Sequence, residues 1–200
     1  PGLRAEVMRT ELQNRLTDDN VTADHHVVLF GFGAHYAVLP ELGIIAGVHQ
    51  GFSPVSPGQT SDIKPESSMN YEAGLRLTMK QPKLSFELIG FFSHYSNLVG
   101  ECTFSSGCEQ DQIDQQYNAG EVYVGGLESV ASYIPELGGG YTLPVRLSYT
   151  FTHTAFQTDF TSSNPQFGEV EAGDALPYVP SHQLSAQVGV DSEYWSFGAN

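Results

Sequence analysis

The 200-residue sequence has few basic residues and few cysteines, and it lacks any long hydrophobic run. Without a run of about 18 apolar residues, no segment can form a transmembrane helix, although membrane strands would show no such run either. Lysine and arginine together number 8 against 23 acidic residues, which gives a formal net charge of −15. Because phosphate binding needs clustered positive charge, this composition argues against a nucleic-acid partner.

The only two cysteines are Cys102 and Cys108, in the segment CTFSSGC. No second Cys or His pair stands at zinc-binding spacing, so the sequence predicts no zinc site. We predict a local disulfide, which the chain-entropy model values at about 2 kcal/mol for so short a loop. A disulfide implies an oxidising compartment such as a periplasm or a cell surface. The alternative is two free thiols in a cytosolic protein.

Helical periodicity is also missing, since helix-forming residues do not recur at i, i+3 and i+4 for more than a turn. What is present is alternation with a period of two. In MNYEAGLRLTMK (Met69 to Lys80), the odd positions are apolar and nearly all even positions are polar, which predicts a strand with one apolar face. The same pattern predicts about nine strands. They are residues 2–12, 26–38, 43–52, 69–80, 84–97, 120–133, 141–156, 182–191 and 194–200.

Short and long connectors alternate along the chain. Tight turns are predicted at 39–42, 81–83, 134–140 and 192–193, and long polar loops at 13–25, 53–68, 98–118 and 157–181. Tight turns at one end and long loops at the other are typical of an outer-membrane barrel. Tilted strands of about 12 residues also match an apolar band of about 25 Å. The pattern therefore predicts an all-β, antiparallel, up-and-down transmembrane β-barrel fragment.

Several motifs occur in a fixed order along the chain. They are Phe52 and Pro54; Lys64, Pro65 and Glu66; Asn70, Tyr71, Glu72 and Gly74; Tyr95, Ser96 and Asn97; and Gly120, Glu121, Gly126 and Glu128. This series resembles the C-terminal half of the barrel of TonB-dependent outer-membrane receptors of the ferric-citrate type. The CTFSSGC loop is similar to a loop of the same branch.

The resemblance implies that residues 1–200 are a partial barrel domain, about nine strands of about 22, in the bacterial outer membrane. It implies import of a ferric chelate, ferric citrate or another siderophore, with energy from the TonB complex acting through a plug domain. The chain starts at Pro1 without a signal region and ends within a predicted strand, so we expect an internal fragment. We also expect a monomer that contacts outer-membrane lipid.

Candidate ligand-binding residues lie on polar faces and at strand ends. Arg76 and Arg146 can meet an anionic chelate or a plug carboxylate through the guanidinium fork; the alternative is pairing with Glu72 or Glu87 in the wall. Residues that close strands at the outer end can reach a ligand vestibule. They are His49, Gln50, Phe52, Tyr95 and Asn97.

Other chemistry is not indicated. No Ser/His/Asp or Cys/His set has a spacing from which a catalytic geometry follows, so we predict no enzyme and no cofactor. The acidic loops lack the ordered series of an EF-hand, and we predict no metal site. A bulge at Gly125 and Gly126 is expected to bring Glu121 and Glu128 to one face. The alternatives for the whole protein are a passive outer-membrane channel and a secreted β-sandwich binding module.

Overall fold

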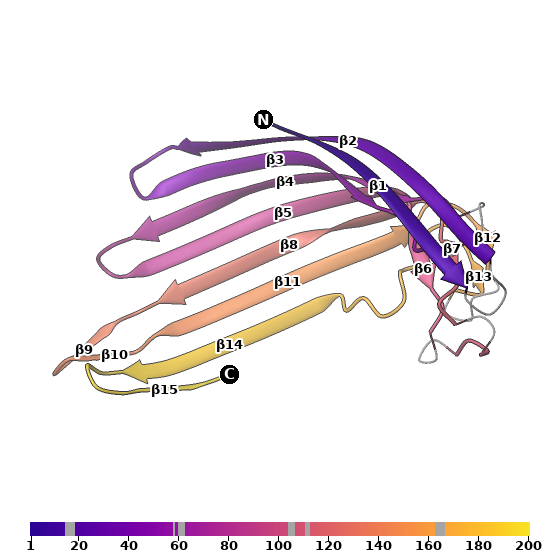
Figure 1. The fold of residues 1–200 in the computed structure, drawn as a ribbon. Coiled ribbons are helices and arrows are strands. Elements are labelled where there is room, and N and C mark those ends of the chain that lie inside the picture. Colours follow the sequence, from indigo (N-terminus) through magenta and orange to yellow (C-terminus); the bar gives the residue numbers. More distant parts are fainter. Residues whose placement is uncertain (15–18, 58, 60–62, 104–106, 111–112, 163–166) are drawn as a thin grey trace.

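The computed structural model describes residues 1–14, 19–57, 59, 63–103, 107–110, 113–162 and 167–200. Its main feature is one curved antiparallel sheet (Figure 1). The long neighbouring strands are β1 (Gly2–Asn14), β2 (Asp19–Ala37), β3 (Leu42–Ser53), β4 (Glu66–Met79), β5 (Leu84–Asn97), β8 (Val122–Tyr133), β11 (Val145–Phe156) and β14 (His182–Asp191), followed by the short β15 (Ser196–Ala199). The predicted all-β antiparallel meander is thus confirmed.

The described strands form an open sheet. β1 pairs with β2 and β15 pairs with β14, so these two strands lie at opposite sides and do not pair with each other. A small hairpin of β9 (Glu136–Gly138) and β10 (Tyr141–Thr142) extends one end of the sheet. No helix in the described ranges is long and apolar enough to cross a membrane.

One face of the sheet is an exposed apolar belt. In register across β3, β4 and β5, Val48 pairs with Tyr71 and Tyr71 with Phe92. The large side chains on this face are solvent-exposed, as far as 70% for Leu184. Exposed members of the belt are Phe32, Tyr36, Ile44, Tyr71, Leu75, Phe86, Phe92, Leu127, Leu147, Phe151, Leu184 and Val188. A contiguous apolar surface of this extent is typical of contact with a membrane or a partner rather than with water.

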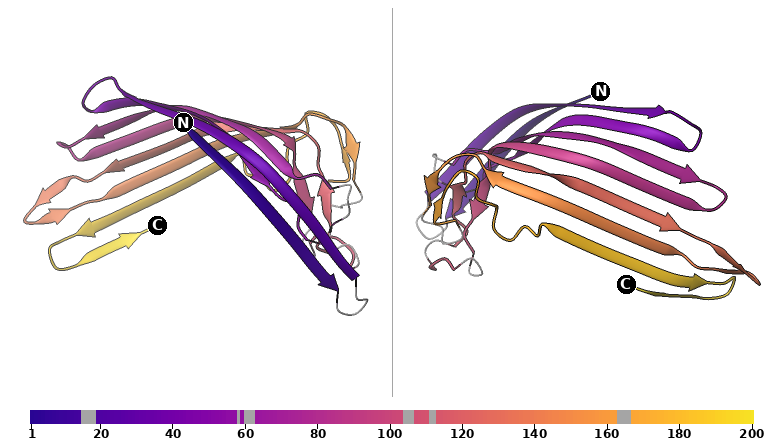
Figure 2. Two further views of the ribbon diagram at one scale, coloured as in Figure 1. Left: turned by 45° about the horizontal axis from the view of Figure 1, so that its top comes forward. Right: turned by 180° about the vertical axis from the view of Figure 1, so that it is seen from behind.

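The opposite face is polar and lies on the concave side. Its strands present His49, Glu72, Arg76 and Glu87 in alternation with the belt residues. In the two views of Figure 2 the sheet arches over this side, and the short strands of the long loops lie at one end of it. We call the end with loops 53–65, 98–121 and 157–181 the long-loop end, and the opposite end the short-turn end.

A buried core occurs only at the long-loop end of the described chain. Two loops there carry short hairpins, β6 (Val99–Glu101) with β7 (Gln116–Asn118) and β12 (Phe160–Thr161) with β13 (Glu169–Val170). The fully buried residues of the cluster are Ala119, Val122, Phe156 and Val170, with Tyr95, Leu98, Val124, Phe160, Phe167 and Leu176 packed around them. This loop core, rather than the sheet itself, resembles the interior of a soluble protein.

The prediction of a long loop at 13–25 is wrong for residues 13–14 and 19–25, which the structure describes as strand. β1 runs to Asn14 and β2 begins at Asp19, with unbroken pairing from Gly2 opposite Gly31 to Asn14 opposite Asp19. The two strands project beyond the sheet as a ribbon (Figure 2). The projecting part of the ribbon lies beyond the apolar belt, so its sequence need not alternate between apolar and polar residues. Its polar composition is therefore similar to that of a loop.

Two smaller predictions are corrected. The strand predicted at 141–156 is divided into β10 and β11 at Pro144, which has no N–H to donate to a ladder. The bulge predicted at Gly125 and Gly126 is absent, because β8 pairs continuously with β5 and β11 through both glycines. A register shift occurs instead between Ser67 and Ser68.

Gly126 serves packing rather than a bulge. A Cβ at this position would lie 2.0 Å from the Phe151 carbonyl oxygen and 2.8 Å from Cζ of Phe91. Glycine therefore lets the Phe91 ring lie against β8. Without a bulge, Glu121 and Glu128 stay on opposite sides of the sheet, and Glu121 bonds to His94 on the belt side.

Candidate functional site

The predicted ligand residues lie at the two ends of the sheet. Those at the long-loop end are His49, Gln50, Phe52, Tyr95 and Asn97; those at the short-turn end are Arg76 and Arg146. His49 pairs in register with Asn70, which precedes Arg76 on β4. At about 3.4 Å per residue, the distance from Asn70 to Arg76 is about 20 Å along the strand. The two groups therefore cannot contact one small ligand together.

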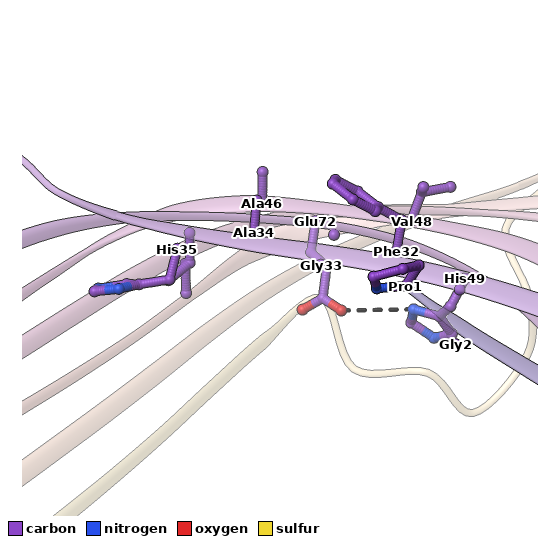
Figure 3. A pocket seen from close by; sticks show the side chains of 13 residues that line it. Pro1, Gly2, Phe32, Gly33, Ala34, His35, Ala46, Val48, His49 and Glu72 are labelled. Atoms are coloured by element: carbon purple, nitrogen blue, oxygen red, sulfur yellow. Dashed lines mark ion pairs between the residues drawn. The ribbon is translucent and has the colours of Figure 1, made fainter.

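His49 and Glu72 form an ion pair on the polar face, with 3.6 Å between Nδ1 and Oε1 (Figure 3). They line a hollow of about 630 Å³ whose wall includes Gly31, Gly33 and Gly47. A Cβ on Gly47 would come within 3.4 Å of the Glu72 side chain. Because the glycines leave the wall bare, the imidazole and carboxylate stand clear of it and can bond to a polar group in the lumen.

Gln50 and Phe52 alternate with His49 and so lie on the belt side of β3. The Gln50 side-chain oxygen accepts a hydrogen bond of 3.3 Å from the Phe30 backbone N–H. Gln50 pairs in register with Met69 and Phe52 with Ser67. His49 is therefore separated from its two predicted companions by the thickness of the sheet.

Tyr95 lies at the boundary between β5 and the loop core. It pairs in register with Val122 and packs against the buried cluster that contains Val122 and Phe156. Phe156 is only 1% exposed. The side chain of Tyr95 thus packs between the end of β5 and the buried residues of the long loops.

Asn97 holds two long loops together. Its amide Nδ2 donates to the Lys64 carbonyl at 2.9 Å and lies 3.3 Å from Oδ1 of Asn118. That same Asn118 oxygen accepts a hydrogen bond of 3.1 Å from the Lys64 N–H. The end of β5 thus fixes loop 53–65 against loop 98–121.

Glutamines extend this connection, and the sequence analysis did not identify them. Gln116 accepts from the Ser56 N–H at 3.0 Å and donates to the Ser56 hydroxyl at 2.9 Å. Gln59 accepts from the Gln116 N–H at 2.8 Å and donates to the Asp114 carbonyl at 2.7 Å. Polar loop residues have no periodicity or motif, so no sequence signal marks such pairings across about 55 residues.

The third long loop joins the same assembly. The Gln157 N–H donates to the Glu121 carbonyl at 2.8 Å. The Phe167 ring lies against Gly100 so closely that a Cβ there would be 2.3 Å from Cε2. We call the described parts of loops 53–65, 98–121 and 157–181 the loop layer. It lies at the long-loop end of the concave side (Figures 1 and 2).

The two arginines share a hollow of about 260 Å³ at the short-turn end. Arg76 Nε lies 2.5 Å from Glu87 Oε2. Arg76 is therefore paired within the wall, which is the alternative that the sequence left open beside ligand binding. Arg146 pairs in register with Ser132, and no carboxylate of the described residues forms an ion pair with it. Arg146 is therefore the guanidinium that an anionic group in the lumen can reach.

Cys102 and Cys108 are joined by a disulfide, with their Cα atoms 5.9 Å apart. Cys102 is fully buried. Its N–H donates to the Gln115 carbonyl and its carbonyl accepts from the Asp114 N–H, both at 2.9 Å. The disulfide thus anchors the turn of loop 98–121 to the strand that leads back to β8.

Histidine and acidic side chains do not gather into a metal centre in the described part of the chain. There, no group of three or more His, Cys, Asp or Glu residues is arranged to hold an ion. The shortest contact between a histidine and a carboxylate in these ranges joins only two groups, His94 Nε2 and Glu121 Oε1 at 2.7 Å. A pair of this kind is a hydrogen bond between side chains rather than a ligand set.

Comparison with solved structures supports the same architecture. The chain is similar to the ferric citrate transporter FecA in its unliganded form, with a TM-score of 0.65 and 19% identity over 98% of this chain. It is also similar to the ferric yersiniabactin uptake receptor FyuA from Yersinia pestis, with a TM-score of 0.58 and 21% identity over 90% of this chain. The matches cover 28% and 26% of those two proteins. No curated protein matches the sequence.

The family model "TonB dependent receptor-like, beta-barrel" matches residues 1–200. Members of this family are transport receptors rather than enzymes, and they lie in the bacterial outer membrane. The apolar belt accordingly faces lipid, the concave polar face lines the lumen, and the long loops are extracellular. The whole-chain match establishes that this chain belongs to the TonB-dependent receptor β-barrel family.

Proposed function

We propose that the protein containing this chain binds a ferric chelate at its extracellular mouth and imports it with energy from the TonB complex. The observation that carries the proposal is the polar lumen wall. The His49–Glu72 pair lies on it below the loop layer, and Arg146, which has no ion-pair partner among the described residues, lies near the periplasmic end. Such a wall offers hydrogen-bond partners and one cation along the path of an anionic ligand.

Ferric citrate is the proposed ligand, with other siderophores as alternatives. The likeness to FecA in fold favours this choice over an uncharged chelate. The net charge of −15 opposes it, because acidic loops repel an anion. Arg146, which has no acidic partner among the described side chains, provides a local positive potential that offsets this repulsion within the lumen.

The test is uptake of radiolabelled ferric citrate by cells that express the full-length gene, with and without the inner-membrane energy complex. The proposal predicts uptake that requires the complex and is competed by unlabelled ferric citrate. Uptake that is indifferent to the complex would favour a passive channel. Energy-dependent uptake of another chelate, without ferric citrate uptake, would retain the transport function and replace the ligand.

A further inference from the structure

Two histidines, His153 of β11 and His182 of β14, occupy neighbouring positions on the lipid-facing side of the sheet. Phe151 pairs in register with His182, and His153 follows Phe151 by two positions on the same face. His153 is therefore the diagonal neighbour of His182, with Cβ atoms about 7 Å apart. Imidazole rings on side chains with this Cβ separation are close enough for one N–H of each to donate to the oxygens of one phosphate group.

A third histidine, His94, reaches the same height in the membrane. His94 pairs in register with Tyr123, and Tyr123 pairs with Ala155 two strands away from His94. His153 precedes Ala155 by two positions, so in register it lies two residues nearer the short-turn end than His94. Strands about 4.8 Å apart and tilted by about 45° shift level by about 1.4 residues per strand. The short turns show the same shift, because the β4–β5 turn lies further toward the short-turn end in register than the β2–β3 turn. The three histidines thus mark one level, at the extracellular edge of the belt.

An apolar hollow of about 390 Å³ opens directly beside His153 on this side. Its floor is Gly125, and the side chains around it are Phe92, Tyr123, Leu127, Phe151, His153 and Ala155. Gly125 pairs in register with both Phe92 and His153, so the missing side chain creates the space between them. The hollow is continuous with the apolar belt, which is the lipid interface of this family.

No lysine or arginine of β3 to β14 stands at this level. Arg76 and Arg146 lie on the lumen face, Lys80 and Lys83 at a short turn, and Lys64 in a long loop. Nδ1 of His182 lies 2.8 Å from the Tyr149 hydroxyl, and in the tautomer in which Nδ1 accepts from this hydroxyl, Nε2 carries the hydrogen and is a free donor. His153 is exposed and has no hydrogen-bond partner among the described residues. Histidine therefore replaces the usual lysine or arginine as the donor to lipid headgroups here.

We propose that His153 and His182 bind the phosphate of one phosphorylated lipid of the outer leaflet, with one of its acyl chains in the Gly125 hollow. The charged and titratable groups around this site are His94, Glu121, Tyr123 and Tyr149. Glu121 is bonded to His94 on the far side of the hollow, so its carboxylate does not face the phosphate. The site is independent of the chelate and of energy coupling.

The test uses the full-length receptor in mild detergent, with bound lipid counted by native mass spectrometry. The probes are diphosphorylated lipid A and its dephosphorylated form. Each hydrogen bond to a charged group is worth about tenfold in affinity, so two predict about a hundredfold preference for the phosphorylated probe. His153→Phe removes one of the two donors and should lower this preference by about tenfold, whereas His35→Phe, which removes a histidine of the lumen face, should leave it unchanged.

A second pair of variants tests the hollow. Gly125→Val should lower retention of both probes, while Gly90→Val, on the same face with no atom within 3.8 Å of its Cβ, should retain them. Heat-dependent gel mobility verifies folding of each barrel. Equal retention of the two probes by the wild type, or an unchanged preference in His153→Phe, would overturn the proposal. A dimer mass in place of bound lipid would assign this face to a second copy instead.

Discussion

The side-chain amide of Asn97 donates a 2.9 Å hydrogen bond to the backbone carbonyl of Lys64. Since Lys64 in turn donates to Asn118, one residue at the end of β5 connects two extracellular loops that are far apart in sequence. Asn97 is therefore one of the residues, with Gln59 and Gln116, that hold these loops together as one layer. In the proposed function, the ligand passes this layer to reach the polar wall.

Asn97→Ala should loosen the loop layer without unfolding the barrel. The Asn97 bonds to Lys64 and Asn118 are solvent-exposed, so their loss costs about 0.5–1.5 kcal/mol and destabilises the loops rather than the barrel. We expect faster proteolysis within 53–65 and 98–121 at unchanged barrel melting. Asn70→Ala, whose amide bonds only within β3 and β4, is the matched control. Equal proteolysis of the two variants would contradict the role of Asn97.

Gly126→Ala should destabilise the barrel, whereas Gly90→Ala should not. The new Cβ at 126 would lie 2.0 Å from the Phe151 carbonyl oxygen, while the nearest atom to a Cβ at 90 is 3.8 Å away. Overpacking of this kind costs about 1–3 kcal/mol. Unfolding in guanidinium, followed by the change in gel mobility, measures the difference. Equal midpoints would show that β8 can shift to accommodate the methyl group.

The Arg76–Glu87 pair should contribute little to stability. Both side chains are substantially exposed, at 54% and 31%, so solvent screens the interaction. A double-mutant cycle with Arg76→Ala and Glu87→Ala should give a coupling free energy of about 0.5 kcal/mol. A coupling well above 1 kcal/mol would mean that the lumen around this pair is much drier than the open wall suggests.

Arg146→Ser should reduce uptake of an anionic chelate, since it removes a guanidinium that forms no ion pair within the described ranges. Loss of a charge-assisted contact predicts a fall of about tenfold in uptake at low ligand concentration. Lys83→Ser makes the same change in charge at a short turn, where Lys83 pairs with Glu136, and should have little effect. Unchanged uptake by Arg146→Ser would remove this residue from the ligand path.

Removal of the disulfide by Cys102→Ser with Cys108→Ser should affect the loop layer alone. Closing so short a loop is worth about 2 kcal/mol in the chain-entropy model. Because the pair lies beyond the end of β6, barrel melting should stay constant while loop 98–121 becomes more sensitive to protease. A lower barrel melting temperature would show that the loop layer stabilises the sheet.

The strands could be predicted because lipid on one side imposes strict alternation on their sequences. β5 begins at Leu84 and ends at Asn97, as the sequence predicts. Alternation also placed Arg76 on the polar face and left Glu72 and Glu87 as its possible partners in the wall, of which the structure pairs it with Glu87. It failed only at the far end of the ribbon of β1 and β2, at residues 13–14 and 19–25, because residues in water on both faces are under no such constraint.

The site could be predicted only in part. Strand ends were identified correctly, but the roles of Tyr95 and Asn97 depend on loops that fold back over the sheet. His49 and Gln50 lie on opposite faces of β3, which alternation alone could have predicted. The hydrogen bond between Gln59 and Gln116 could not be predicted from the sequence, because it depends on which loops meet in space.

The most direct test of the account is labelling of single cysteines with a membrane-impermeant maleimide; the native cysteines are joined and do not react. Gln110→Cys, in a long loop, should be labelled in intact cells, and Gln81→Cys, in a short turn, only after lysis. Leu184→Cys should resist labelling in both cases, because lipid covers a position that is 70% exposed in the isolated chain. Ready labelling of Leu184→Cys, or of Gln81→Cys in intact cells, would contradict the assignment of the faces and ends of this barrel.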